Sequence, residues 1–513
     1  MRQSYQVIYN AMTNYGRTLI QGIAGFLLIP FVVHRIGQES YGVVLLAMAA
    51  FGMVELCGQG LSKAVIKHFA EQEARGNREL LKLIFNSSLL WFFTVGAIGS
   101  AIIFFVGAYF ESCFKNIPPE LIRQGQLSMY IIAAVICPCL ILDIFKGILS
   151  ARQRYDIVNL ICTSIAVTRV LLIVGYFGFI QPSLIAVVII YAITYIAERL
   201  AHLLVSYRIV SVPAISLSAI NREGIRLIVG FASMILVITA ANMLVTNIIK
   251  FIIASKLSLT DVTHYGIILL LIGTANMLVR NFVNVLVPVV SKYQGLENYD
   301  VIQKMFLHGT KYAVIIVVAS IGVTMPFLPG LLRLWMGPEF EHLWSIGIVM
   351  FIGQIIGSSS VCANQILSGL GKVRFIAIAG LICAVSGLSM VWVYLHYWPG
   401  AILLGVAILM VIYRTIVSGS IFTYGIKVIG GRWQDMLAKA IAKPVLIGGL
   451  VALLGVGFVR LVGIESWLVL VFSVFVTEVI FLMLTYLWCL DKEEKCRGVE
   501  LLQKTYSKVT GNS

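Results

Sequence analysis

Four arginines stand inside stretches of the chain that are otherwise apolar: Arg17, Arg169, Arg280 and Arg414. A charge at the centre of a membrane-spanning helix costs at least ~2.5–3.5 kcal/mol, so such residues usually face a water-filled cavity or a partner. A guanidinium group stays charged when partly buried, and its planar fork binds phosphate through two hydrogen bonds. The four arginines are therefore candidates for binding an anion. For Arg169 and Arg414 the alternative is a buried ion pair or a bond to backbone carbonyls.

Asparagines accompany Arg280 in the same stretch. Asn276 lies four residues before it and Asn284 four residues after it, so the three side chains share one helical face. A polar stripe of this kind is expected to face a wet interior. The alternatives are an ion pair between Arg280 and Glu55, or a guanidinium that extends to the membrane surface. Arg17 has the same choice between binding an anion and extending to the surface.

Three acids also fall in or near apolar stretches: Glu55, Asp143 and Glu478. An intramembrane carboxylate can release and rebind a proton, or bind Na⁺, as a transporter changes state. Glu55 and Asp143 are candidates for this coupling, and the alternative for Glu55 is a static ion pair with an arginine. Asp143 has Lys146 three residues on, and these two are expected to pair. Glu478 is expected to be structural or to line a groove.

Long apolar segments must position all these groups. The chain has 513 residues, of which 59% are hydrophobic and only 12% are charged, about half the charged fraction of a soluble domain. A helix needs about 20 apolar residues to cross the hydrocarbon core. Fourteen segments meet that length, at residues 10–34, 41–62, 82–109, 126–149, 157–178, 183–206, 224–253, 262–290, 305–333, 341–368, 373–396, 400–424, 441–461 and 466–490.

The connections between these segments are short and leave no room for a soluble catalytic domain, so the chain is not predicted to be an enzyme. No Cys or His spacing matches a metal site, and neither a metal nor a cofactor is expected. If both termini are cytoplasmic, most of the 38 Lys and Arg residues, Arg199 included, fall on the cytoplasmic side. Short cytoplasmic loops normally collect these residues. The net charge of +15 therefore reflects topology and does not predict binding to nucleic acid.

The chain also repeats itself. The segment from Ser40 to Phe69 resembles the segment from His264 to Tyr293, and "ILSARQRYDIVNLICTSIAV" from Ile148 resembles "ILSGLGKVRFIAIAGLICAV" from Ile366. The repeat predicts two parallel six-helix bundles, at residues 1–207 and 208–430. Two further helices at 431–490 and a solvated cytoplasmic tail at 491–513 follow. Transporters built from such repeats hold their substrate near the midplane between the copies and alternate access by rocking.

Three stretches resemble a known family: "FLLIPFVVHRIGQESYGVVLLAMAAFGMVELCGQGLSKAVIKHFAE" from Phe26, "ILSARQRYDIVNL" from Ile148 and "ILSGLGKVRF" from Ile366. They resemble the Wzx-type O-antigen or capsule repeat-unit flippases of the multidrug/oligosaccharidyl-lipid/polysaccharide exporter superfamily. The resemblance implies an all-α membrane protein whose two bundles surround a central cavity. It also implies that the extra helices at 431–490 form a groove for a lipid tail.

The cargo implied by this resemblance is an undecaprenyl-pyrophosphate-linked oligosaccharide, moved from the cytoplasmic to the periplasmic leaflet of the bacterial inner membrane. The substrate contacts would be Arg17, Arg169, Arg280, Arg414, Asn276 and Asn284, and Glu55 and Asp143 would couple transport to H⁺ or Na⁺. A monomer is expected, with a polymerase and a chain-length regulator of the same pathway as partners.

Three alternatives stay open on the sequence. The cargo could be the lipid-linked peptidoglycan precursor. A cation-coupled multidrug exporter of the same superfamily would instead have acids and aromatics in its cavity and usually twelve spans. A membrane polymerase or ligase would have a large periplasmic loop containing Arg and His, which this sequence lacks.

Overall fold

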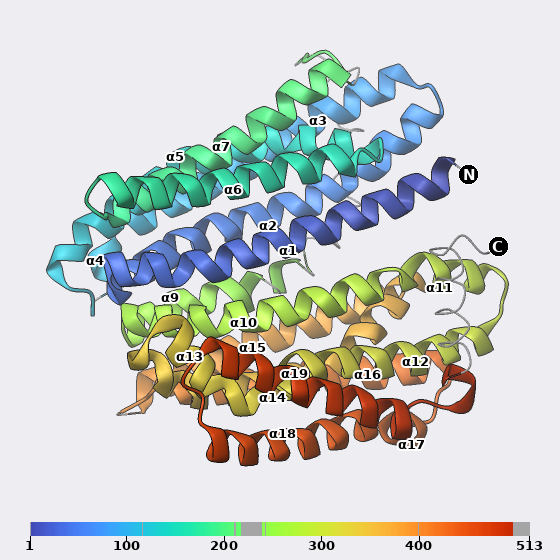
Figure 1. The fold of residues 1–513 in the computed structure, drawn as a ribbon. Coiled ribbons are helices and arrows are strands. Elements are labelled where there is room, and N and C mark those ends of the chain that lie inside the picture. The colour runs from blue at the N-terminus through green and yellow to red at the C-terminus, as the bar shows by residue number, and fades with distance from the viewer. Residues whose placement is uncertain are drawn as a thin grey trace, which may run out of the picture. The chain divides into compact units, whose positions relative to one another are not determined.

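The computed structural model describes residues 2–114, 116–209, 212–216, 237, 239–241, 243–398 and 400–495. In these residues the chain is helical and contains no strand, as the sequence predicted (Figure 1). Thirteen helical segments in the described part are long and apolar enough to cross a membrane. They match thirteen of the fourteen expected spans. Half of the remaining one, at 224–253, falls outside the described residues.

The chain forms two compact units, the first from Met1–Leu270 with Ile376–Val406 and the second from Leu271–Phe375 with Ala407–Ser513. The bundle boundaries expected near residues 207 and 430 stay predictions. The first unit contains α1 (Arg2–Ile36), α2 (Gln38–Ala74), α3 (Arg78–Ala108), α4 (Phe110–Cys113), α5 (Pro119–Ala151), α6 (Tyr155–Phe179), α7 (Leu184–Ile209), η2 (Leu244–Ile248), α9 (Ile249–Lys256), the start of α10 (Leu259–Asn284) and most of α15 (Val373–Tyr397).

The second unit contains the rest of α10 and most of α16, together with the remaining described helices. These are α11 (Leu286–Gly295), α12 (Tyr299–Val317), η3 (Val318–Gly322), η4 (Met325–Phe327), α13 (Leu328–Met336), η5 (Pro338–Leu343), α14 (Trp344–Gly369), α16 (Leu403–Ile429), α17 (Trp433–Asp435), η6 (Met436–Ala442), α18 (Lys443–Val462), α19 (Trp467–Leu484) and η7 (Thr485–Cys489).

Helix α5 is the centre of the first unit, where it packs against α2, α3 and α7. Glycines on α3 allow close contact between the helices. A Cβ atom on Gly96 would press against Cys137 of α5, and one on Gly99 would press against Val54 of α2. Small residues at such interfaces bring helix backbones together, which is how helices associate where lipid removes the hydrophobic driving force.

The connection between α2 and α3 is a tight turn. Gly76 adopts φ of 70°, in the left-handed region that favours glycine. Asn77 caps α3, because its side chain accepts a hydrogen bond of 3.1 Å from the backbone nitrogen of Leu80. Gly76 and Asn77 therefore end one helix and begin the next.

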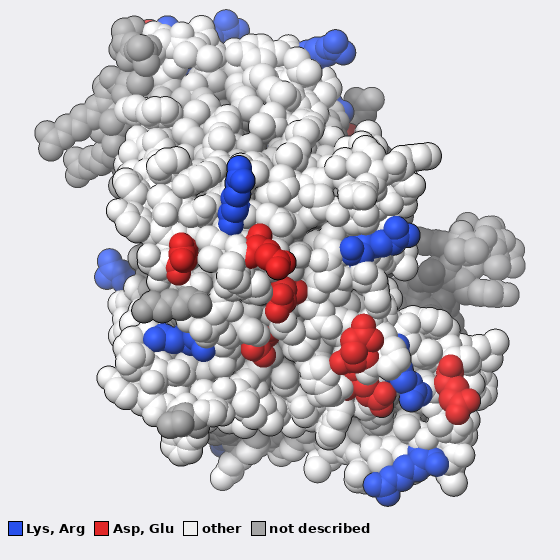
Figure 2. Space-filling view, turned by 90° about the vertical axis from the view of Figure 1, so that its left-hand side faces the viewer, with Lys and Arg blue, Asp and Glu red and all other residues white. Residues whose placement is uncertain are grey.

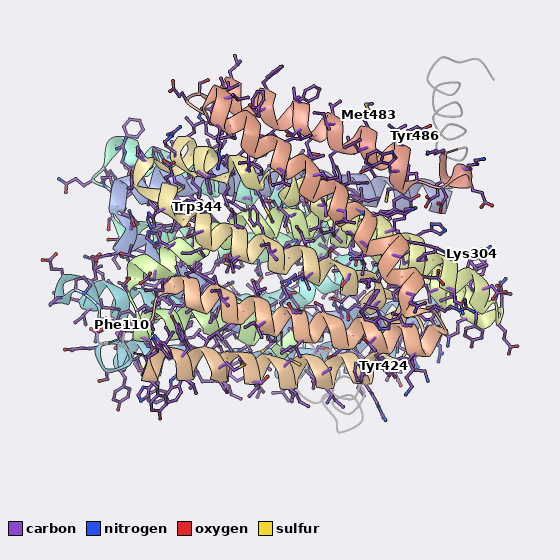
Figure 3. The ribbon with its side chains drawn as sticks, turned by 90° about the horizontal axis from the view of Figure 1, so that it is seen from below. Phe110, Lys304, Trp344, Tyr424, Met483 and Tyr486 are labelled. Carbon is purple, nitrogen blue, oxygen red and sulfur yellow. The ribbon has the colours of Figure 1, made fainter. Side chains whose placement is uncertain are left out.

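In the second unit, α18 and α19 pack against the end of α12 and against η3. Val314, Val318, Val451 and Phe481 belong to one buried apolar cluster. The opposite side of α19 is exposed, and Met483 of α19 and Tyr486 of the following η7 are labelled in Figure 3. An apolar exposed face is what a lipid-facing helix requires. In agreement with the low charged fraction, the face in Figure 2 carries only small groups of charged side chains.

The tail expected at 491–513 is described only as far as residue 495, where residues 491–493 are exposed and the side chain of Glu494 is buried. Glu494 has a side chain only 8% exposed. It accepts hydrogen bonds from His308 Nδ1 at 2.7 Å, Lys311 Nζ at 2.6 Å and Tyr312 Oη at 3.1 Å. These three donors are spaced i, i+3 and i+4 on α12, so they share one helical face. A buried carboxylate therefore holds the start of the tail on α12.

Candidate functional site

A charged cavity of about 430 Å³ lies inside the first unit, between α1, α2, α5, α6 and α7. A cavity with convergent polar groups in an otherwise apolar bundle is the default hypothesis for a binding site. Its polar lining residues are Arg17, Gln21, Glu55, Gln59, Lys146, Arg169, Tyr191, Tyr195, Glu198 and Arg199. It brings together three residues that the sequence singled out on separate spans: Arg17, Glu55 and Arg169.

Arg199 is the most buried charge at this cavity, with a side chain 3% exposed. Its Nη2 atom lies 2.6 Å from Glu55 Oε1, its Nη1 atom 2.9 Å from Glu198 Oε1, and its Nε atom 3.6 Å from Asp143 Oδ1. Helices α2, α5 and α7 each supply one of these carboxylates. A buried charge is tolerated when it is paired in this way, so Arg199 joins the three helices electrostatically.

Asp143 does not pair with Lys146, and the prediction of that local pair is wrong. Asp143 instead contacts Arg199 and accepts a hydrogen bond of 3.2 Å from Ser62 Oγ. Lys146 Nζ lies 3.9 Å from Glu198 Oε1. The reason is tertiary, because the fork of Arg199 on α7 reaches acids from neighbouring helices at once. The alternative that Glu55 forms an ion pair with an arginine is confirmed, and that arginine is Arg199.

Arg169 on α6 is held by neutral groups. Its Nε atom donates a hydrogen bond of 2.8 Å to Thr194 Oγ1. Its guanidinium carbon lies 4.7 Å from the ring centre of Tyr191 and 4.6 Å from that of Tyr195. These contacts are cation–π interactions, which orient the guanidinium without neutralising it. No carboxylate of the described residues lies within ion-pair distance of Arg169.

Arg17 on α1 also lacks a carboxylate within ion-pair distance in the described part of the chain, and it lines the cavity beside α6 and α7. Around Arg199 and Lys146, the three carboxylates outnumber the cations by one when all are ionised. Arg17 and Arg169 reverse the sign of this local charge. The cavity as a whole is therefore suited to an anion.

The remaining predicted residues lie in the second unit, where three of them contact α14. Asn276 and Gln354 form two reciprocal amide hydrogen bonds. Asn284 Oδ1 accepts a hydrogen bond of 3.0 Å from Gln365 Nε2. The guanidinium of Arg414 lies against Gly357, where a Cβ atom would collide with it. This packing leaves the amides of the expected stripe bound to α14.

Arg280 is exposed on α10. No carboxylate of the described residues lies within ion-pair distance of it. The side chain of Asn281, in the same stretch, lies outside the described part of the structure. Arg280 therefore keeps the charge and the accessibility that an anion contact requires.

Sequence reasoning missed the centre of the charged cavity. The count of basic residues places Arg199, in "YIAERLAHLLV", on the cytoplasmic side of the sixth span and Lys146 on the cytoplasmic side of the fourth. In the structure α7 continues to Ile209, ten residues past Arg199. The apolar residues after the Glu-Arg pair are the signal that could have shown this. Nothing in the sequence indicated Tyr191 and Tyr195, because tyrosine is common in membrane helices.

Helix α19 carries a separate apolar hollow of about 530 Å³. It is lined by Trp467, Leu468, Val471, Phe472 and Phe475. Glu478, on the same helix, is half-buried and has no ion pair or hydrogen bond to another described residue. Among the described residues, no group of three or more His, Cys, Asp or Glu side chains is placed to hold a metal ion.

No family model matches the chain, and no curated protein matches it in sequence. Solved structures do match. An inward-facing MATE family multidrug resistance transporter of the MOP superfamily has a TM-score of 0.70 at 14% identity, over 82% of this chain and 98% of that one. The lipid II flippase MurJ in an inward closed conformation has a TM-score of 0.65 at 13% identity, over 93% of this chain and 99% of that one.

The chain has the fold of the MOP-superfamily transporters. A third match is a MOP superfamily transporter from Pyrococcus furiosus, with a TM-score of 0.59 and 16% identity over 83% of this chain and 95% of that one. The neighbours are transporters and flippases. This likeness agrees with the fold that the sequence resemblance implies, and the low identities restrict the comparison to the fold.

Proposed function

We propose that this protein is a flippase that moves an undecaprenyl-pyrophosphate-linked oligosaccharide between membrane leaflets by alternating access. The observation that carries the proposal is the charged cavity, where Arg17 and Arg169 have no carboxylate partner among the described residues. A pyrophosphate is an anion that a guanidinium fork binds through charge-assisted hydrogen bonds. A cavity whose basic side chains were all paired with carboxylates would not prefer an anion.

The groups that surround Arg169 support its role in binding the pyrophosphate. Thr194 occupies Nε, and the rings of Tyr191 and Tyr195 lie close to the guanidinium. The terminal nitrogens keep their hydrogens for a ligand in the cavity. A preoriented arginine loses little conformational entropy when it binds. Arg280, Arg414, Asn276 and Asn284 are proposed as further contacts for the pyrophosphate and the sugars.

The apolar hollow on α19 is proposed to hold the lipid tail. Its aromatic and aliphatic side chains match a polyprenyl chain in chemistry. The lipid II flippase shares its fold with 93% of this chain, which gives the proposal a structural parallel in a protein named for a lipid-linked cargo. The same likeness to the lipid II flippase keeps the peptidoglycan precursor as a second candidate cargo.

Glu55 and Asp143 are proposed to couple transport to H⁺ or Na⁺. Both carboxylates contact Arg199, and Glu55 also lines the cavity. Protonation of one of them would weaken its attraction to Arg199 and change how α2, α5 and α7 are held together. We further propose that the protein is a monomer in the bacterial inner membrane with both termini in the cytoplasm. Its proposed partners are a polymerase and a chain-length regulator of the same pathway.

The test is flipping of a fluorescent undecaprenyl-pyrophosphate oligosaccharide in proteoliposomes. Arg169→Ala and Arg280→Ala are expected to slow flipping at least about tenfold each, since a charge-assisted hydrogen bond contributes roughly 1.5–3 kcal/mol. Arg169→Lys and Arg280→Lys should keep part of the rate. The matched control is Arg123→Ala, because Arg123 is an exposed arginine on α5 that does not line the cavity.

Flipping at the wild-type rate by Arg169→Ala, at equal protein levels, would show that Arg169 is structural. Export of organic cations without flipping of any lipid would favour the multidrug exporter. Equal flipping of the oligosaccharide lipid and the peptidoglycan precursor would leave the mechanism intact and broaden the cargo.

A further inference from the structure

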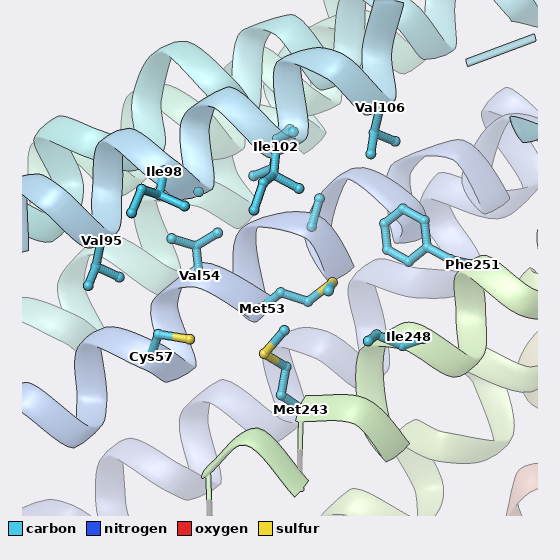
Figure 4. A pocket seen from close by; sticks show the side chains of 13 residues that line it. Met53, Val54, Cys57, Val95, Ile98, Ile102, Val106, Met243, Ile248 and Phe251 are labelled. Atoms are coloured by element: carbon cyan, nitrogen blue, oxygen red, sulfur yellow. The ribbon is translucent and has the colours of Figure 1, made fainter. Parts of the chain in front are cut away.

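A second cavity in the first unit has a volume of about 430 Å³, and the described residues that line it all have apolar side chains. It lies between α2, α3 and the segment formed by η2 and α9 (Figure 4). Met53 and Val54 of α2, Val95 and Val106 of α3, and Phe251 of α9 are among its lining residues. A cavity without polar partners does not hold ordered water and instead takes apolar ligands.

This apolar cavity opens on the outer surface of α3. Ile98 and Ile102 line it and are also 57% and 58% exposed. Such exposed isoleucines on a membrane-crossing helix face hydrocarbon. The cavity is therefore accessible from lipid.

The length of the cavity matches one leaflet. Its lining on α3 runs from Val95 to Val106, which at ~1.5 Å per residue is about 16 Å. Half of the ~30 Å hydrocarbon core is ~15 Å. An acyl chain of a bilayer phospholipid has this length because such chains make up the leaflet. A polyprenyl chain that spans more than a leaflet fits less well.

A pair of basic side chains lies beyond one end of this cavity. Lys256 is the last residue of α9, five residues after Phe251, or about 8 Å along the helix. Its Nζ atom lies 3.0 Å from His396 Nδ1 on α15. An ammonium group has only donors, so Nδ1 accepts this hydrogen bond and the ring proton lies on Nε2. Both side chains therefore retain N–H donors for an anion.

Other contacts hold this basic pair in place. The ring of Trp392 stacks on His396 with centroids 4.8 Å apart, and Lys256 Nζ lies 5.4 Å from the same ring. Asn116 Nδ2 donates a hydrogen bond of 3.0 Å to the carbonyl of Leu257. No carboxylate of the described residues lies within ion-pair distance of Lys256. Tryptophan at a helix end is typical of the membrane–water interface, which is where lipid phosphates lie.

We propose that the first unit binds one anionic phospholipid of the bilayer. One acyl chain occupies the apolar cavity, and the headgroup phosphate binds Lys256 and His396. This lipid is separate from the cargo and holds η2 and α9 against α2 and α3. The inference does not depend on the proposed function, because it concerns a different cavity and different side chains.

The test is native mass spectrometry of the full chain in detergent, titrated with phosphatidylglycerol or phosphatidylcholine. We expect one phosphatidylglycerol to bind about tenfold more tightly than phosphatidylcholine. The double variant Lys256→Gln/His396→Gln should lose this preference, because a charge-assisted hydrogen bond contributes enough for about a tenfold effect. Ile102→Trp, which fills the cavity from its lipid side, should weaken both lipids.

Two substitutions serve as matched controls. Lys304→Gln removes an exposed lysine of α12, and Ile382→Trp enlarges an isoleucine of α15 that is 63% exposed and outside the cavity. Neither should change lipid binding. Equal binding of phosphatidylglycerol by the wild type and the double variant would overturn the phosphate site. Unchanged binding by Ile102→Trp would overturn the role of the cavity.

A measurement on the wild type covers the case in which the variants fail to fold. Phosphatidylglycerol with a photoreactive acyl chain should form adducts concentrated on peptides of α2, α3 and α9. Soluble glycerol 1-phosphate should compete at least about tenfold less well than the whole lipid. Adducts spread evenly over all lipid-facing helices would contradict the proposal, as would equal competition by glycerol 1-phosphate.

Discussion

Arg169 and Arg199 line the same cavity, and they differ in whether their charge is paired with carboxylates. Arg199 contacts three carboxylates and is almost fully buried, so its charge is neutralised within the protein. Arg169 contacts a hydroxyl and two aromatic rings, which hold its position and leave its charge available. One arginine therefore joins helices, and the other can bind an anion. Residue type alone could not distinguish them.

Substitution of Thr194, whose buried hydroxyl holds Arg169, tests whether this contact positions the guanidinium. Thr194→Val keeps the shape of the side chain and removes the acceptor for Arg169 Nε. A buried donor left without a partner costs about 1–3 kcal/mol, so we expect lower stability by that amount and slower flipping. Thr168→Val is the control, since Thr168 is exposed on the same helix as Arg169. Chemical unfolding in mixed micelles measures the free energy of unfolding of both variants. Equal stability of the two would contradict the role of Thr194 in holding Arg169.

At the scale of elements, α12 and the segment after α19 are joined by Glu494. Burial of Glu494 opposes its ionisation, and the hydrogen bonds from Lys311, the backbone of Asp491 and His308 outweigh burial, so its pKa is lowered to about 2. The ordinary value is 4.5. The ionised carboxylate therefore stabilises the folded state. That stabilisation is complete above about pH 4.5 and is lost as the pH falls toward about 2.

Glu494→Gln tests this link through its pH dependence. The variant should be less stable than the wild type at neutral pH, because Lys311 loses its charged partner while buried. The difference should shrink as the pH falls below about 4.5, because Glu494 of the unfolded wild type then takes up a proton while the folded carboxylate stays ionised. Thermal unfolding in detergent measured from about pH 3 to pH 7 gives both curves. A difference that stays constant over that range would show that the carboxylate charge is not responsible.

At the scale of the whole molecule, the orientation in the membrane is proposed from the distribution of basic residues. Cys113 is exposed just after α3, on the side proposed to be periplasmic, and Arg75 is exposed in the turn between α2 and α3. A membrane-impermeant maleimide should label Cys113 in intact cells. In a Cys113→Ser background, it should label the new cysteine of Arg75→Cys only after the membrane is opened. The reverse labelling pattern would show that the protein has the opposite orientation. The proposed orientation rests on the rule that loops rich in Lys and Arg stay in the cytoplasm.

The helical fold and most of its spans follow from the amino-acid sequence alone. Apolar length decides whether a helix crosses a membrane, and that property is local. The turn at Gly76 and Asn77 is also a local feature, since a left-handed glycine and a helix cap depend on neighbours in the chain. The arginines inside spans were also visible, because charge in an apolar stretch needs no partner to be noticed.

Which charges neutralise each other depends on how the helices pack in three dimensions. Asp143 has a lysine three residues away and contacts an arginine of another helix, because ion pairing follows distance in space. The cation–π contacts of Arg169 and the burial of Glu494 join residues that are far apart in the sequence. Such contacts depend on how helices pack, and helical periodicity does not specify which helices are neighbours.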